Sequence, residues 1–206
     1  MGKDSFYCKY IKNIIDRGIA LLGLLLFWWL YIIIAILIKL DDPKGPVIFK
    51  QERLGKKGKV YRMYKFRSMR VGAEHMGSGV YSDNNDTRVT RVGKFLRATS
   101  LDELPQLVNL LKGEMSLIGF RSPLTYHPWT WDEYTEHQKK MFELRPGITG
   151  WAQVNGRKTV EWNKRIELNV WYAENVSFLL DLKIFFMTIF KVFSNADNEN
   201  KGKTVG

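Results

Sequence analysis

Two adjacent carboxylates, Asp102 and Glu103, are the residues of this chain whose type and setting most readily allow chemistry. One carboxylate could attack a phosphorus atom while the other holds a metal ion. A structural explanation competes with this one, because Ser100 and Glu103 have the spacing of a capping box and acidic residues in a first helical turn suit the helix dipole. Taken alone, adjacent acids favour the cap.

Pro105 weighs against the cap, because as the fifth residue of a helix it would remove a backbone donor that the helix needs. A helix that begins near Leu104–Pro105 has no such conflict. Both carboxylates would then lie just outside the positive end of that helix, where a magnesium-bound diphosphate could also lie. We therefore predict the later start.

Basic residues lie on both sides of the carboxylates in the sequence. Phosphate groups need such cations, although a basic set is more often a solvated surface. The set comprises Lys65, Arg67, Arg70, Arg88, Arg91, Lys94, Arg97 and Arg121. It raises the weight of phosphate chemistry without deciding the matter.

Magnesium, bound by Asp102 and Glu103, is the metal that this composition suggests. The histidines His75, His127 and His137 are isolated and have no cysteine partners, which argues against a zinc site. The sequence also lacks a P-loop and a G-x-G-x-x-G motif that opens a helix, so nucleotide hydrolysis and dinucleotide chemistry are not favoured.

A long apolar segment precedes these residues and predicts a membrane helix. The 21 residues from Gly18 to Ile38 are uncharged, and Arg17 and Lys39 close its two ends. A helix of this length reaches across a hydrocarbon core about 30 Å thick. The segment is too long for a cleaved signal peptide, and no small-residue cleavage site follows it.

The charges flanking this segment leave two topologies open. Residues 1–17 carry four basic and two acidic side chains (+2), and residues 39–70 carry eleven and three (+8). Both flanks are thus positive, and the positive-inside rule does not choose between a simple span and a helix that returns to its own side. Because the segment contains no proline to force a bend, residue-level physics prefers the span.

The rest of the chain predicts a mixed α/β, mostly helical domain. Val47–Phe49 and Val60–Phe66 suggest a short hairpin, residues 72–88 a loop, and Leu104–Leu111 a helix that stops at Lys112-Gly113. Arg145–Arg157 suggests a structured loop and Trp162–Tyr172 a further helix. The apolar stretch Val176–Phe193 contains Asp181, Lys183 and Lys191, so it reads as an interfacial amphipathic helix or, equally well, as a core helix. We divide the chain into an anchor (1–40), a catalytic domain (41–194) and a flexible polar tail (195–206).

The net charge of +11 over 206 residues is concentrated beside the apolar segment. That placement favours anionic lipid over nucleic acid, since a nucleic-acid domain more often carries a basic stripe across its folded body. Cys8 is the single cysteine, so no intrachain disulfide forms and nothing indicates an oxidising compartment.

From Ile11 to Phe193 the chain resembles the bacterial sugar transferases, the monotopic phosphoglycosyl transferases. The resemblance rests on the blocks Gly45–Arg53, Tyr64–Met69, Thr99–Gln106 and Arg145–Arg157. It implies a re-entrant membrane helix with a small helix-rich catalytic domain on the cytoplasmic face of the bacterial inner membrane. It also implies transfer of a phosphosugar from a UDP-sugar to polyprenol phosphate with release of UMP, the step that initiates assembly of a capsule, an exopolysaccharide, an O-antigen or a glycoprotein glycan.

The resemblance also implies roles for individual residues. The position of Asp102 is that of a nucleophile that carries the phosphosugar covalently, and the position of Glu103 is associated with Mg²⁺. Lys65, Arg97 and Arg121 are expected to contact phosphate or organise the site, and Arg145 and Gln153 to bind substrate. The expected partners are UDP-sugar, polyprenol phosphate and membrane lipid, with downstream glycosyltransferases and a second copy of the chain as further candidates and no nucleic acid.

The chain departs from the family pattern at two places. The family usually has Pro-Arg-Pro where this chain has Phe120-Arg121-Ser122, so Arg121 is kept in a changed backbone setting. The family breaks its re-entrant helix with Ser-Pro, whereas Trp28-Trp29 stands at about that position here. We still favour re-entry, because a spanning helix would place the positive N-terminal flank on the far side and because bulky tryptophans could wedge a bend.

A non-catalytic protein of the membrane surface is the main alternative. In that case the basic flank and the C-terminal amphipathic helix bind anionic lipid, and Asp102 and Glu103 only cap a helix. An RNA-binding module is a weaker option that predicts salt-sensitive RNA affinity. No motif in the sequence identifies the sugar or the oligomeric state.

Overall fold

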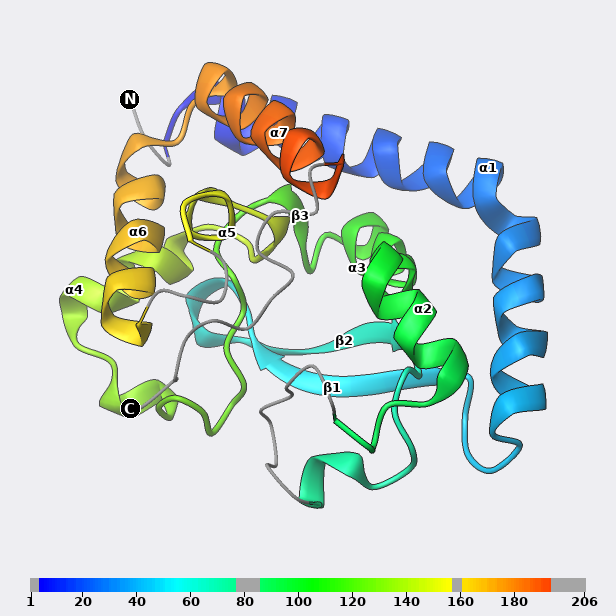
Figure 1. Cartoon of the computed structure of the whole chain (residues 1–206). Coiled ribbons are helices and arrows are strands. Elements are labelled where there is room, and N and C mark those ends of the chain that lie inside the picture. Colours follow the sequence, from blue (N-terminus) through cyan, green and yellow to red (C-terminus); the bar gives the residue numbers. More distant parts are fainter. Residues whose placement is uncertain (1–3, 77–85, 157–160, 194–206) are drawn as a thin grey trace.

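The computed structural model describes residues 4–76, 86–156 and 161–193. Helices dominate this part of the chain and surround two small β-sheets (Figure 1). The predicted mixed, mostly helical domain with a short hairpin is thus confirmed. The predicted tail at 195–206, most of the loop at 72–88 and Arg157 lie outside the described residues.

The apolar N-terminal segment forms one continuous helix. A π-helical turn at Tyr7–Ile11 leads into α1, Lys12–Asp41, a run of 30 residues. In the described ranges, Tyr7–Asp41 is the only helix long and apolar enough to cross a membrane. Most side chains of α1 are exposed apolar groups, and only a few positions along it are buried.

Helix α1 bends without a proline. It runs alongside α7 and then turns sharply to follow another side of the domain (Figure 1). Its packing changes accordingly, since Ala20 lies in a core cluster with Leu110, whereas Ile34 and Ile38 pack in a separate cluster with Phe66. Both halves of α1 therefore contact the same domain.

A side-chain hydrogen bond within α1 offers a physical reason for the bend. The indole Nε1–H of Trp29 donates to the backbone oxygen of Leu26 at 3.0 Å, between the two packing regions. A side chain that engages a backbone carbonyl competes with the helical hydrogen-bond ladder, which is one of the known causes of helix bending.

The hairpin consists of β1, Ile48–Leu54, and β2, Val60–Phe66, paired antiparallel from Ile48 opposite Phe66 to Leu54 opposite Val60. A turn at Lys56–Gly58 joins them. The first strand extends to Leu54, well past the predicted Phe49. The basic residues Lys50 and Arg53 masked its strand character, because a two-stranded hairpin leaves much of its surface polar.

A second, parallel pair was not predicted. Strands β3, Ser116–Ile118, and β4, Gly147–Thr149, pair through Ser116 opposite Gly147 and Ile118 opposite Thr149. A three-residue strand is too short to show an alternation of apolar and polar residues. The sequence therefore does not indicate β3, and β4 lies within the segment Arg145–Arg157 for which it predicts a structured loop. Gly119, Gly147 and Gly150 allow the close approach, since a Cβ at Gly150 would lie 1.8 Å from the oxygen of Gly119.

The remaining elements are helical. They are the turn at Ala73–His75, α2 (Arg91–Thr99), the single 3-10 turn η4 (Leu101–Glu103), α3 (Gln106–Lys112), the turn at Trp131–Glu133, α4 (Glu136–Lys139) with the turn Lys140–Glu143, α5 (Trp151–Val154), α6 (Trp162–Asn175) and α7 (Phe178–Phe193). The predicted helix at Trp162–Tyr172 is confirmed as α6, and the stop at Lys112-Gly113 as the end of α3, where Gly113 has φ +77°.

Helix α7 settles one of the alternatives drawn from the sequence. Leu179, Leu182, Phe186 and Ile189 form an apolar stripe at helical spacing along α7, and these residues are exposed. The face of α7 that packs inward instead carries Asp181 and Ile184. An ordinary core helix would bury the stripe, so α7 is not one, and the stripe remains open to a further apolar environment.

Candidate active site

The carboxylates lie in a short connection between two helices. Helix α2 ends at Ser100, whose φ of +58° is left-handed, and Asp102 and Glu103 then form the turn η4. Helix α3 begins at Gln106 with Pro105 as its N-cap residue, which confirms the later start that Pro105 predicted. The capping-box alternative is wrong, because the Ser100 side chain makes no capping hydrogen bond. Ser100 closes α2 in a left-handed conformation, whereas an N-cap serine needs extended dihedral angles.

Asp102 is a buried carboxylate, with 9% of its surface exposed. Burial raises its pKa above the ordinary value, and the charge of Glu103 raises it further, while Lys65 and Arg97 oppose both effects. Among the described residues, no side chain donates a hydrogen bond to the Asp102 carboxylate. Asp102 is therefore a poorly solvated anion held between charges of both signs, a setting more typical of a functional carboxylate than of a solvated cap.

Glu103 is fixed by the strand beside it. The Lys65 ammonium, at the end of β2, lies 2.9 Å from Glu103 Oε1, and both side chains are about three-quarters buried. Of the sequence-predicted residues, the structure thus brings together Asp102, Glu103, Lys65 and, through its charge, Arg97.

Helix α1 packs against this connection from two directions. The Tyr31 hydroxyl donates to the oxygen of Leu104 at 2.6 Å, directly after Glu103. At the other end of α2, Asp41 Oδ2 accepts from the backbone N–H of Val92 at 2.9 Å. Gly23 lies against Leu107 of α3. The apolar helix is therefore part of the scaffold that holds the carboxylates.

Arg121 is held outward by two buried neighbours. The Phe120 side chain is 1% exposed and packs edge-on against Phe142, with ring centroids 5.0 Å apart. The Ser122 hydroxyl donates to the oxygen of Leu54 at 2.6 Å, which ties the segment to β1. Core packing and a side-chain hydrogen bond thus hold the backbone at the positions where the family pattern has proline. Arg121 itself is exposed and forms no hydrogen bond or ion pair in the described part of the chain.

Arg53 is a candidate site residue that sequence reasoning missed. Its guanidinium donates to the oxygen of Ser122 at 2.8 Å and to Gln51 Oε1 at 2.6 Å, and no carboxylate pairs with it in the described ranges. Burial, followed by the neighbouring charge of Arg121, lowers its pKa to about 10. The block Gly45–Arg53 contained the residue, but only the pairing of β1 with residues 122–124 reveals that it lies beside Arg121.

Other basic residues of the predicted set serve the fold. Arg67 is 5% exposed and pairs with Asp42 at 3.2 Å, and Arg88 pairs with Asp86 at 2.6 Å. Arg91 and Lys94 are exposed on α2. Arg97, at the end of α2, has no hydrogen bond or ion pair among the described residues. The cations left without an anion are thus fewer than the sequence suggested, and Arg97, Arg121 and Arg53 are among them.

Arg145 and Gln153 are not brought into contact with the carboxylates. Arg145 lies 3.0 Å from Asp16 of α1, and Asp16 also accepts from the Ser116 hydroxyl at 2.7 Å. Gln153 is 9% exposed, and neither its Oε1 nor its Nε2 has a hydrogen-bond partner among the residues that the structure describes. A buried amide without partners is uncommon and is a place where a ligand could supply them. The substrate roles of both residues stay predictions.

Comparison with known proteins places these features in a family. The family described as bacterial sugar transferase matches residues 7–195. The uncharacterized sugar transferase EpsL of Bacillus subtilis is 48% identical over 149 residues, which cover 72% of this chain and 70% of that protein. The UDP-glucose:undecaprenyl-phosphate glucose-1-phosphate transferase of Escherichia coli is 43% identical over 192 residues, 91% of this chain and 41% of that protein.

A further relative is named for a different sugar. The UDP-N-acetylgalactosamine-undecaprenyl-phosphate N-acetylgalactosaminephosphotransferase of Aeromonas hydrophila is 41% identical over 183 residues, which cover 87% of this chain and 43% of that protein. The chain therefore spans about two fifths of the length of the Escherichia coli and Aeromonas relatives. Similar identity to proteins named for glucose and for N-acetylgalactosamine leaves the sugar unassigned.

Proposed function

The chain belongs to the bacterial sugar transferase family, and from that membership we propose that it transfers a phosphosugar from a UDP-sugar to polyprenol phosphate and releases UMP. The Escherichia coli and Aeromonas hydrophila relatives are named for reactions of a UDP-sugar with undecaprenyl phosphate. The observation that carries the proposal is the buried carboxylate of Asp102, beside the ion-paired Glu103 and within reach of the charge of Arg97, which pairs with no anion among the described residues.

Asp102 is the proposed nucleophile. In the first step a carboxylate oxygen of Asp102 attacks the sugar-linked phosphorus, and the bond from that phosphorus to the bridging oxygen breaks, so that UMP leaves with the electron pair. In the second step a phosphate oxygen of the polyprenol phosphate attacks the same phosphorus, and the Asp102 carboxylate is released. Burial supports this role, because a poorly solvated carboxylate is more reactive than a hydrated one.

The unpaired cations are suited to the diphosphate of the donor. Arg53 lies within reach of the charges of Arg121 and Glu103, and Lys65 and Arg97 act on Asp102 through their charges. Guanidinium groups bind phosphate oxygens through paired, charge-assisted hydrogen bonds. We assign Arg53 and Arg121 to the donor phosphates and Lys65 to the orientation of Glu103.

The donor set fits a magnesium ion. Mg²⁺ in proteins is commonly held by one or two carboxylates together with substrate phosphates, and Asp102 and Glu103 supply two carboxylates. The described residues contain no group of three or more acidic, histidine or cysteine side chains that would form a metal cage. When bound, the ion would offset the charge on the phosphates. Lys65 holds Glu103 in place and would share it with the ion.

For the anchor we propose re-entry into the cytoplasmic membrane, with both flanks and the catalytic domain on the cytoplasmic face. Supporting this, α1 bends, and its two ends contact one domain through Asp16 with Arg145 and through Asp41 with Val92. In a Cys8→Ser background, a cysteine at Lys3 should stay unlabelled by an impermeant reagent in intact cells. Labelling from outside would establish a span instead.

The reaction is tested with the purified full chain, magnesium, polyprenol phosphate and a panel of UDP-sugars, by measuring released UMP. We expect release with at least one donor and none with Asp102→Asn. Asp132→Asn, a change at an exposed aspartate, serves as the matched control and should behave as the native chain. If Asp102→Asn keeps native turnover, Asp102 is not the nucleophile. If no donor releases UMP but the chain binds anionic vesicles, the lipid-binding alternative holds.

A further inference from the structure

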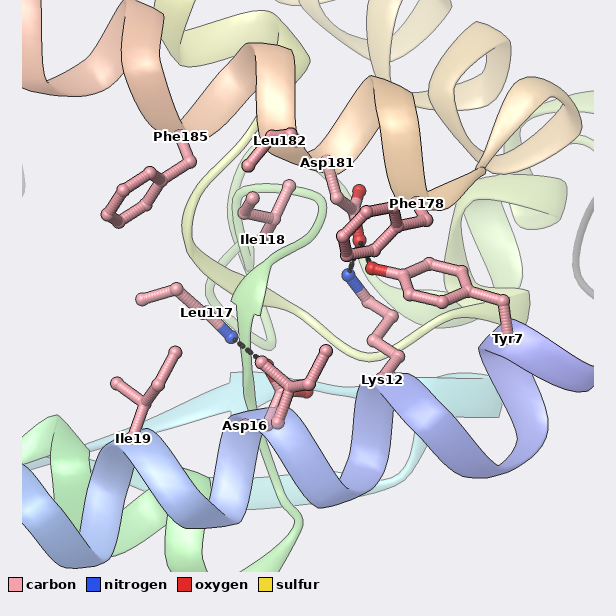
Figure 2. Close-up of a pocket in the computed structure, with 11 residues that line it drawn as sticks. Tyr7, Lys12, Asp16, Ile19, Leu117, Ile118, Phe178, Asp181, Leu182 and Phe185 are labelled. Carbon is pink, nitrogen blue, oxygen red and sulfur yellow. Dashed lines mark hydrogen bonds and ion pairs between the residues drawn. The ribbon is translucent and has the colours of Figure 1, made fainter.

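An apolar groove separates the first half of α1 from α7 (Figure 2). Its volume is about 190 Å³. Leu117 of β3 lies at its base, Ile15 and Ile19 line it from α1, and Leu182 and Phe185 line it from α7. These four helical side chains are each between 37% and 40% exposed, so the groove opens to the outer surface of the two helices.

The charged residues beside the groove are already satisfied. Asp181 pairs with Lys12 and accepts from the Tyr7 hydroxyl at 2.6 Å (Figure 2). It also accepts from the Tyr172 hydroxyl at 2.6 Å. Asp16 accepts from Ser116 and pairs with Arg145. Lys12, Asp16 and Asp181 are 6%, 2% and 5% exposed. The described residues that line the groove therefore offer a ligand no free charge, and the ligand that fits the groove is a hydrocarbon chain.

Helix α1 connects this groove to the carboxylates. From Ile19 the helix passes Gly23, which contacts Leu107 of α3, and reaches Tyr31, which is bonded to Leu104 next to Glu103. These 12 residues of α1 correspond to about 18 Å of helix at 1.5 Å per residue. A chain that leaves the active site along α1 would thus meet the groove after about that distance.

We propose that the groove binds part of the isoprenoid chain of the polyprenol phosphate acceptor. The inference rests on the proposed function, which places the acceptor phosphate at Asp102. A phospholipid acyl chain has the same apolar chemistry, but only the acceptor has a head group that must reach the carboxylates while its tail lies along α1. The groove then favours long acceptors over short ones and has no part in the step that releases UMP.

The test compares two phenylalanines of α7 in the full chain reconstituted in lipid nanodiscs. Phe185 lines the groove, whereas Phe190 is 72% exposed and is not among the lining residues. Phe185→Ser should raise the KM for undecaprenyl phosphate about tenfold, which corresponds to about 1.4 kcal/mol, and leave the KM for farnesyl phosphate unchanged. Phe190→Ser should change neither value. Leu182→Trp, which fills the groove, should act as Phe185→Ser does.

Two controls separate the possible outcomes. UMP release in the absence of acceptor, a single turnover per enzyme, should be native in all three variants, and its absence in the native chain would mean that the proposed function itself fails. An equal loss with long and short acceptors, or the same loss in Phe190→Ser, would overturn the acceptor proposal and mark the groove as a contact for bulk phospholipid.

Polyprenyl phosphate with a photoreactive group in its tail should label peptides of α1 or α7. Labelling confined to other segments would likewise overturn the acceptor proposal.

Discussion

The ion pair of Lys12 and Asp181 joins the first turn of α1 to α7, and its removal should destabilise the whole molecule. Both residues are buried, at 6% and 5% exposure. Asp181→Leu removes the acceptor used by Lys12, Tyr7 and Tyr172 and leaves the ammonium of Lys12 in the interior without a counter-charge. Loss of one member of a buried pair costs about 3–5 kcal/mol. For a chain of this size that corresponds to a melting temperature lower by about 6–20 °C.

The double variant Lys12→Met/Asp181→Leu should recover much of this loss. It removes both charges together, so no charge is left uncompensated in the interior, and apolar side chains fill the space. The remaining destabilisation comes from the hydroxyls of Tyr7 and Tyr172, which lose the Asp181 carboxylate as their acceptor. Tyr172 keeps a contact to the oxygen of Ile118 at 3.4 Å, so the residual cost is that of about one buried hydroxyl, about 1–3 kcal/mol.

Thermal unfolding of the detergent-solubilised chain, followed by circular dichroism, measures both effects. Glu174→Leu is the control, because it removes the carboxylate of a second lysine ion pair, Lys140 with Glu174 at 2.8 Å, whose side chains are 45% and 48% exposed. We expect no measurable change in the control. A double variant as unstable as Asp181→Leu would show that the damage comes from packing and not from the uncompensated charge, and the reasoning would then be wrong.

Three further predictions concern the site and the anchor. Burial raises the folded-state pKa of Asp102 above its unfolded value, so the ionised carboxyl costs stability once the pH exceeds the folded pKa. Asp102→Asn should therefore raise the melting temperature near neutral pH, and this increase should disappear as the pH falls towards 3.8. An equal increase at both pH values would contradict this reasoning. Arg53→Gln should raise the KM for the UDP-sugar about tenfold or more in the UMP assay, because a charge-assisted hydrogen bond contributes about 1.5–3 kcal/mol, whereas Arg62→Gln, at an exposed strand position, should not. Trp29→Phe removes the indole bond to the Leu26 oxygen and should widen the distance between spin labels at the two ends of α1; an equal change in Trp28→Phe would show that the bond does not set the bend.

Local chemistry made part of the site predictable. Pro105 has no backbone N–H to donate, and this property predicts that α3 begins at about Pro105. It follows that both carboxylates precede the helix. The left-handed Ser100 was not predictable in the same way. From the sequence, serine at this position is typical of an N-cap residue. The structure shows that α2 ends directly before Ser100, so Ser100 terminates that helix.

Pairings between distant segments account for what the sequence did not reveal. Arg67 and Arg88 looked like phosphate ligands because they stand near the carboxylates in the chain, yet each is buried against an aspartate. Arg53 lies outside the predicted strand Val47–Phe49 and was not predicted as a site residue. It lies beside Arg121 because residues 122–124 pair along the edge of β1. Basic residues can be counted from sequence, but whether a cation is neutralised depends on which segments fold against it.

The sequence suggests an apolar helix separate from the catalytic residues, but in the structure the helix α1 packs against the elements that carry them. Tyr31 and Gly23 contact the α3 region, Asp41 caps α2, and Asp16 holds the Ser116 hydroxyl and Arg145 beside β3 and β4. Helix α1 thus contacts α2, the α2–α3 connection and α3, and its Ile34 and Ile38 also pack with Phe66 at the end of the hairpin. A catalytic domain cut at residue 40 would expose these partners and lose the support of the α2–α3 connection. The carboxylates and the apolar helix are therefore packed together, and the helix that supports the carboxylates is the one that we propose enters the membrane.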